Sequence, residues 1–225
     1  LQDNGLSFKG STVVVSGSGN VAIYAIEKAM QLGAKVVACS DSNGYIFDKE
    51  GIKLETVKRI KEIERKRIKE YINEHPHAEY YEGCSGIWSI PCDIALPCAT
   101  QNEIDKKAAE LLVSNGVKAV GEGANMPSTL EAIDVFLSNN ILFGPAKAAN
   151  AGGVAVSALE MAQNSARLSW SFEDVDGKLR EIMKNIYRNC VNAANVYGCP
   201  GNLVAGANIA GFKKVADAMV EQGIV

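Results

Sequence analysis

The segment Gly17-Ser-Gly-Asn-Val-Ala22 combines residue types and a spacing that suit the binding of a pyrophosphate. Gly17 permits a tight turn, and Gly19 lets the main chain approach an anion closely. A helix that begins here presents free N–H groups and the positive end of its dipole to that anion. The G-x-G-x-x-A pattern therefore predicts a dinucleotide-binding turn, although glycines also form such turns without a ligand.

An acidic residue and a basic segment follow the next predicted strand. Asp41 lies about 20 residues after Gly19, the spacing of the acid that binds the adenosine ribose of NAD. Ser42 comes next, and the segment Arg65-Lys-Arg67 supplies guanidinium groups of the kind that bind a 2′-phosphate. Since the basic segment can equally be a solvated helix face, these residues leave the choice between NAD and NADP open.

Three more polar loops are expected where strands end: Ala99-Thr-Gln101, Asn125-Met-Pro127 and Asn150-Ala-Gly-Gly153. Ligands of open α/β sheets bind at this edge, and such side chains can hydrogen-bond ribose hydroxyls and a carboxamide. The alternative is that they cap helices and satisfy turns. Ser157 has two interpretations as well: it donates to a substrate carboxylate, or it bonds back to its own helix backbone.

The elements that must position these loops alternate along the first 150 residues. Short apolar runs predict strands at residues 12–16, 35–39, 93–97, 117–120 and 141–143, with a possible extension at 45–47. Helical spacing predicts helices at 21–32, 54–72, 103–115 and 128–136, the last capped by Ser128. This order predicts an α/β fold, a Rossmann-like, doubly wound and mostly parallel sheet with helices on both faces.

After Pro145 the strand pattern ends. Helices are expected at residues 154–168, 173–197 and 205–222. We therefore predict a dinucleotide-binding core at 1–150 and a helical C-terminal segment at 151–225 that packs on the core and extends toward a further domain.

Composition excludes several classes of protein. The chain has 225 residues, 47% of them hydrophobic, which is typical of a globular protein and excludes a disordered one. A net charge of −3 argues against a nucleic-acid-binding protein, and no apolar run reaches the roughly 20 residues of a membrane helix. The chain begins at Leu1 without a signal peptide or anchor, and we expect it to be part of a longer protein.

The six cysteines show no Cys-x-x-Cys pair, and the two histidines, His75 and His77, lie far from them in the sequence. We therefore expect reduced thiols in a cytoplasmic protein, no metal site and no catalytic cysteine.

Taken together, the motifs resemble glutamate dehydrogenase of the hexameric bacterial type, specifically its C-terminal, cofactor-binding half. The segments that carry the resemblance are Gly17-Ser-Gly-Asn-Val-Ala22, Pro97-Cys-Ala-Thr-Gln-Asn102, Gly123-Ala-Asn-Met-Pro127, Lys147-Ala-Ala-Asn-Ala-Gly-Gly153, Glu160-Met-Ala-Gln-Asn164 and Ala205-Gly-Ala-Asn-Ile-Ala-Gly211. The resemblance implies the reversible oxidative deamination of L-glutamate to 2-oxoglutarate and ammonia, with hydride passing to a nicotinamide cofactor.

The resemblance also implies roles by position. The implied contacts are Ser18, Asn20 and Val21 for the pyrophosphate; Asp41 and Ser42 for the adenosine ribose or its phosphate, with Arg67 agreeing; Ala99, Thr100 and Asn125 for the nicotinamide ribose; Asn150 for the carboxamide; and Val154 and Ser157 for the substrate side chain and its γ-carboxylate. The family's catalytic lysine and aspartate belong to the other half, so no catalytic residue is expected here. We expect this chain to bind dinucleotide without turnover.

Ser40-Asp-Ser-Asn-Gly44 looks more like the family members that use NADP, so NADP is favoured over NAD. Three alternatives remain: the same domain of an NAD-specific glutamate dehydrogenase, a sibling dehydrogenase acting on leucine, valine or phenylalanine, and a dinucleotide-binding module without chemistry. Ser157 favours glutamate over the apolar substrates, which lack a side-chain carboxylate.

Overall fold

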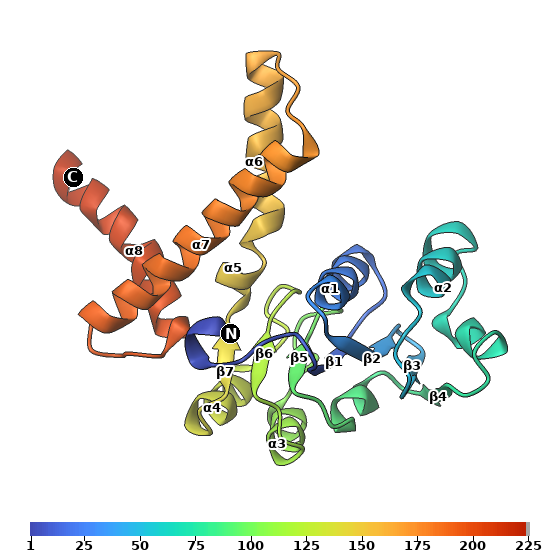
Figure 1. The fold of residues 1–225 in the computed structure, drawn as a ribbon. Helices are drawn as coiled ribbons and strands as arrows, with labels where there is room; N and C mark the ends of the chain where they lie inside the picture. Colours follow the sequence, from blue (N-terminus) through green and yellow to red (C-terminus); the bar gives the residue numbers. More distant parts are fainter. Residues whose placement is uncertain (224–225) are drawn as a thin grey trace. The chain divides into compact units, whose positions relative to one another are not determined.

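Seven strands form one sheet in the order β4-β3-β2-β1-β5-β6-β7 in the computed structural model, which describes residues 1–223 (Figure 1). The strands are β1 (Thr12–Val15), β2 (Lys35–Ser40), β3 (Gly44–Phe47), β4 (Glu79–Glu82), β5 (Ile94–Leu96), β6 (Ala119–Gly121) and β7 (Leu142–Gly144). The five strands β2, β1, β5, β6 and β7 run parallel, while β3 and β4 add an antiparallel edge. The predicted α/β, mostly parallel, doubly wound fold is confirmed.

Helices lie between successive strands: α1 (Asn20–Gln31) between β1 and β2, α2 (Leu54–Lys58) between β3 and β4, α3 (Lys106–Ser114) between β5 and β6, and α4 (Leu130–Ser138) between β6 and β7. The chain winds from β1 outward to β2 in one direction and from β5 outward to β7 in the other. Because βαβ crossovers are right-handed, the helices of the two halves cover opposite faces of the sheet. The apolar face of α1 packs over Val13 and Val15 in the core.

The segment 54–72, predicted as one helix, is not one. The α-helix ends at Lys58, a π-helical turn follows (Arg59–Ile63), and a 3-10 helix occupies Ile68–Asn73. Arg65 between them adopts a left-handed conformation, with φ of 52°. The break has a tertiary cause, because the Ile68 N–H donates to the carboxylate of Asp41 at 3.0 Å instead of to a helix carbonyl.

Two further local predictions were wrong or incomplete. Thr129, not Ser128, caps α4, because its Oγ1 accepts from the Ala132 N–H at 3.3 Å while Glu122 takes the Ser128 N–H. The edge strand β4 was not predicted, since Glu79-Tyr-Tyr-Glu82 lacks the apolar alternation of a half-buried strand.

The chain divides into two compact units, Leu1–Ala146 and the residues from Lys147 onward. The functional boundary after residue 150 stays a prediction. The second unit is helical: α5 (Ala146–Ala149) leads into α6 (Ala151–Ala166), α7 (Phe172–Val196) and α8 (Leu203–Gln222). Over residues 1–223, none of the helices combines the length and the apolar character needed to cross a bilayer.

The helices α7 and α8 cross closely. A methyl group at Gly206 of α8 would lie 2.1 Å from the Cys190 carbonyl oxygen of α7, so only glycine permits this contact. A capping box at Ser171 and Asp174 stabilises the start of α7. The predicted helical character of this segment is confirmed.

Candidate functional site

The winding direction of the sheet reverses between β1 and β5, which are parallel neighbours. At this switch point the connections leave to opposite sides, and open α/β sheets bind their ligands at the carboxyl ends of the two strands there. Residues 16–20 follow β1 and residues 97–104 follow β5. The predicted glycine motif and the predicted Ala99–Thr100 loop therefore lie at the position where open α/β sheets bind ligands.

Residues 16–20, called here the glycine turn, have the geometry that the motif predicts. Gly17 has φ of 85°, and a methyl group on it would lie 3.0 Å from the Cys98 carbonyl oxygen. The buried Ser40 hydroxyl accepts the Gly17 N–H at 2.7 Å, and Ser18 is itself buried. Gly17 is thus required both by its backbone conformation and by the close approach of the next loop.

The first turn of α1 is open to an anion. Gly19 is its N-cap and has no side chain to accept the free N–H groups, and no acidic residue lies in the first turn. A methyl group on Gly19 would meet no heavy atom within 4 Å in the described chain. Asn20 and Val21 are exposed, so the predicted pyrophosphate contacts lie around an accessible, positively polarised helix end.

Hydrogen bonds join the loop after β5 to the loop after β6. The Pro97 carbonyl accepts the Gly123 and Ala124 N–H groups at 2.9 and 3.0 Å, and the Asn102 N–H donates to the Met126 carbonyl at 3.0 Å. Three predicted residues therefore lie on two neighbouring loops: Ala99, Thr100 and Asn125. Ala99, Thr100 and Asn125 are all exposed.

Glu103 and Ser16 also hold the loop after β5, and the sequence did not single out either residue. One oxygen of Glu103, Oε1, accepts the Ala99 and Thr100 N–H groups at 3.0 and 3.2 Å. The Ser16 hydroxyl accepts the Cys98 N–H at 2.8 Å and is hydrogen-bonded to Glu103. The available signal was their position: Ser16 comes one residue before the glycine motif, and Glu103 comes three residues after Thr100.

A buried carboxylate, that of Glu122, holds the neighbouring loop and was also missed. Glu122 is 3% exposed; its Oε2 accepts the Ala146 N–H at 2.7 Å and its Oε1 the Ser128 N–H at 3.2 Å. It therefore fixes the residues after β6 against the end of the first unit.

The carboxylate of Asp41 turns into its own loop. Its Oδ1 accepts the Asn43 N–H at 2.9 Å, its Oδ2 accepts the Ile68 N–H at 3.0 Å, and the Lys61 ammonium lies 3.8 Å away. The side chain is 5% exposed. Asp41 thus organises this part of the chain, and its predicted contact with a ribose stays a prediction.

Ser42 and Arg67 are exposed and lie side by side, although they are far apart in the sequence. The Arg67 guanidinium donates from Nη1 to the Ser42 hydroxyl at 2.7 Å. Lys61, which the sequence did not single out, lies beside Asp41. We call Asp41, Ser42, Lys61 and Arg67 the basic corner; its exposed groups are donors, and its one carboxylate is already paired.

The remaining predicted residues lie in the second unit and are described there by themselves. Asn150 precedes the first turn of α6 as its N-cap, and Val154 is 72% exposed on that helix. The Ser157 hydroxyl donates to the Gly153 carbonyl at 3.3 Å, which is the backbone bond that was the alternative to a substrate contact.

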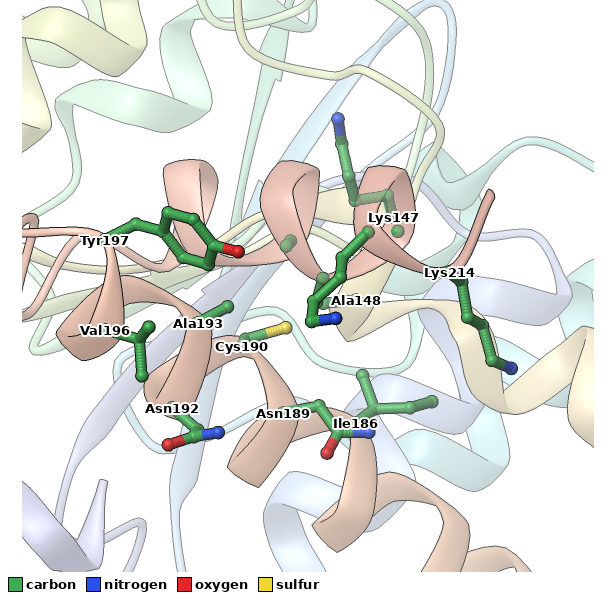
Figure 2. A pocket seen from close by; sticks show the side chains of 14 residues that line it. Lys147, Ala148, Ile186, Asn189, Cys190, Asn192, Ala193, Val196, Tyr197 and Lys214 are labelled. Carbon is green, nitrogen blue, oxygen red and sulfur yellow. The ribbon is translucent and has the colours of Figure 1, made fainter. Parts of the chain in front are cut away.

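A pocket of about 550 Å³ also lies within the second unit, between α5, α7 and α8 (Figure 2). Its lining mixes apolar side chains with Lys147, Asn189, Tyr197 and Lys214. None of the predicted site residues lines it. It is therefore a separate feature from the glycine turn and the basic corner.

The thiols and carboxylates of the described chain do not suggest a metal centre. In residues 1–223 no group of three or more His, Cys, Asp or Glu side chains could hold an ion. The six cysteines are free thiols. Burial raises the pKa of both Cys39 and Cys98 to about 12, with a nearby carboxylate adding to each, so both thiols stay neutral at physiological pH.

Comparison with known proteins gives one consistent family. The model described as Glutamate/Leucine/Phenylalanine/Valine dehydrogenase matches residues 1–223. The NADP-specific glutamate dehydrogenase of Helicobacter pylori is 55% identical, over 100% of this chain and 51% of its own length. The NAD(P)-specific glutamate dehydrogenase of Xylanibacter ruminicola is 54% identical, again over 100% and 51%.

Among solved structures, the crystal structure of Plasmodium falciparum glutamate dehydrogenase has a TM-score of 0.95 with this chain at 49% identity. The match covers 100% of this chain and 49% of that one. The chain thus spans about half the length of the relatives that it matches.

Proposed function

This chain belongs to the glutamate/leucine/phenylalanine/valine dehydrogenase family, and from that premise we propose that it is the cofactor-binding part of a glutamate dehydrogenase that uses NADP. The full reaction would be L-glutamate, NADP⁺ and water to 2-oxoglutarate, ammonia and NADPH. When bound, the cofactor would accept the hydride from the substrate carbon. The residues of this chain would hold and orient the cofactor and part of the substrate.

The basic corner is the observation that carries the choice of NADP. A free carboxylate at the end of the second strand repels a 2′-phosphate, but here Asp41 is turned inward and paired with Lys61. The Arg67 guanidinium and the Ser42 hydroxyl remain exposed as donors for a phosphate. The name of the H. pylori relative, NADP-specific, agrees with this assignment.

The rest of the site fits the other parts of the dinucleotide. The glycine turn and the open first turn of α1, at Asn20 and Val21, suit the pyrophosphate. Ala99, Thr100 and Asn125 would line the nicotinamide ribose, and Asn150 would bind the carboxamide. Val154 would contact the substrate side chain, and Ser157 would exchange its bond to the Gly153 carbonyl for the γ-carboxylate.

A second candidate, use of both NAD and NADP, is favoured by the name of the X. ruminicola relative. An exposed pair of donors at Ser42 and Arg67 does not exclude NAD, which would place only its ribose there. We further propose that the complete protein is a homohexamer in the cytoplasm. The free thiols support the compartment, since disulfides are rare in reducing compartments.

Calorimetry with the 225-residue chain tests the proposal. NADPH should bind more tightly than NADH, and the chain alone should show no glutamate-dependent reduction of NADP⁺. Equal affinity for the two cofactors would favour the second candidate. Failure to bind either would overturn the proposed function, and turnover by the pure chain would overturn its assignment as a cofactor-binding part only.

A further inference from the structure

Glu103 lies between β5 and α3 and makes no ion pair within residues 1–223. Its Oε1 accepts two consecutive main-chain N–H groups, those of Ala99 and Thr100, at 3.0 and 3.2 Å. A carboxylate that accepts more than one backbone N–H fixes the local path of the chain. The two N–H groups are consequently unavailable to a ligand, and the loop can contact one only through its side chains and carbonyl groups.

Ser16 connects this carboxylate to the glycine turn. Its hydroxyl accepts the Cys98 N–H at 2.8 Å and, because a carboxylate only accepts, donates its own hydrogen to Glu103. Ser16 is 1% exposed. A methyl group on Gly17 would lie only 3.0 Å from the Cys98 carbonyl oxygen, so the glycine turn and the loop after β5 are closely packed. Glu103 and Ser16 therefore hold the Cys98–Thr100 main chain beside the glycine turn.

We propose that Glu103 is a positioning residue for the nicotinamide half of the cofactor, because its carboxylate holds the Ala99–Thr100 main chain in the shape that receives the adjoining ribose. This inference rests on the proposed binding of a nicotinamide dinucleotide. It does not involve the basic corner, so Glu103 serves NADPH and NADH alike.

The surroundings of Glu103 make this role dependent on pH. Desolvation by burial raises the pKa of Glu103, while the Ser16 hydroxyl and the two N–H groups oppose the shift. The Cys98 thiol interacts with it electrostatically, and its pKa of about 12 keeps that thiol neutral. Protonation would add a hydrogen to the acceptor and weaken its bonds to the loop. Affinity for NADH, which has no titrating 2′-phosphate, should therefore fall as the pH drops through the raised pKa of Glu103.

Two variants and two probes test the proposal. Glu103→Ala removes the acceptor, and Glu103→Gln keeps the shape and one carbonyl acceptor but does not titrate. NADPH reports on the whole site, whereas adenosine 2′,5′-bisphosphate lacks the nicotinamide half. Glu110→Ala, on an exposed residue of α3, is the matched control. Affinities are measured by calorimetry between pH 5 and 8, within which each variant remains folded by circular dichroism.

Glu103→Ala should bind NADPH roughly tenfold more weakly, as expected for the loss of hydrogen bonds to a charged group, and NADH by the same factor. Its affinity for adenosine 2′,5′-bisphosphate should not change. Glu103→Gln should restore the affinity for NADPH and NADH near pH 7. The fall in NADH affinity at low pH should be absent from this variant, and NADH is used for the pH profile because it has no 2′-phosphate that titrates at about pH 6. If Glu103→Ala is poorly folded, the proposal is tested by comparing how cofactor affinity depends on pH in Glu103→Gln and in the wild type.

The outcomes separate the inference from the function on which it rests. If the wild type binds neither NADPH nor the bisphosphate, the proposed function fails. If the wild type binds both, the inference alone fails on any of three results: unchanged NADPH affinity in Glu103→Ala, equal loss of both probes, or the same pH dependence in Glu103→Gln as in the wild type.

Discussion

In and beside the glycine turn the Ser16 and Ser40 side chains are buried and bind main-chain groups, whereas at the basic corner Ser42 and Arg67 are exposed and bind one another. Ser16 and Ser40 are at most 2% exposed, and each accepts one backbone N–H. Ser42 and Arg67 are exposed and joined by a single hydrogen bond. The first region is part of the folded core, so its changes should affect stability and binding together. The second should affect binding alone.

Gly17→Ala tests the first half of this comparison and should have the largest effect. Residue 17 has a left-handed φ of 85°, which strains an alanine. The new Cβ would also lie 3.0 Å from the Cys98 carbonyl oxygen. We expect a loss of about 1–3 kcal/mol in the free energy of unfolding, with NADPH binding abolished. Gly19→Ala is the control: its Cβ meets nothing in the described chain, so stability should hold while binding weakens. Urea denaturation and calorimetry measure the two effects, and equal stability of the two variants would contradict the prediction.

Ser40→Ala should have the next largest effect. It leaves the buried Gly17 N–H without its acceptor, which costs about 1–3 kcal/mol of stability. The nearby exposed Ser42→Ala should change stability by less than about 0.5 kcal/mol and weaken NADPH instead. Denaturation curves of the two single variants check this. If Ser42→Ala lowers the stability more than Ser40→Ala does, the proposed difference between the two regions is wrong.

The two regions also differ in how far the sequence predicts them. The glycine turn depends on residues next to one another, so Gly17, Gly19 and the start of α1 could be placed from local pattern alone. The basic corner depends on a contact across the chain: the Ile68 N–H binds Asp41, which interrupts the predicted helix 54–72 and brings Arg67 to Ser42. Periodicity carries no information about such a contact.

Glu103 and Ser16 were missed for a related reason. Each side chain bonds to main-chain groups, and a sequence names no main-chain partner for a side chain. Their types, a carboxylate near a predicted helix start and a serine at a strand end, are typical of ordinary caps. Only the fold shows that they bind the same loop.

Arg67→Ala tests the basic corner. Losing a charge-assisted bond to the 2′-phosphate should weaken NADPH by about 1.5 kcal/mol, roughly tenfold, and leave NADH unchanged. Stability should change by less than about 0.5 kcal/mol because Arg67 is exposed. Lys66→Ala, on an exposed neighbour paired with Glu64, is the control and should bind both cofactors as the wild type does. Equal weakening of NADPH and NADH would show that the phosphate binds elsewhere.

Asp93→Asn, at the start of β5 and the opposite edge of the sheet, should have the smallest effect. Hydrogen bonds from the Lys118 ammonium and the Thr12 N–H hold the pKa of Asp93 below its usual range. A lowered pKa in the folded state adds stability at neutral pH that is lost as the pH falls through that pKa. The variant should be less stable by under about 1 kcal/mol at pH 7, and the difference should vanish in acid. Cofactor affinity should stay unchanged, because Asp93 and Lys118 do not lie at the carboxyl edge of the sheet. Denaturation at pH 7 and pH 3 measures the stability, and calorimetry on the same variant measures the affinity. A change in NADPH affinity here would mean that the effects at the glycine turn reflect general stability and not its contacts with the ligand.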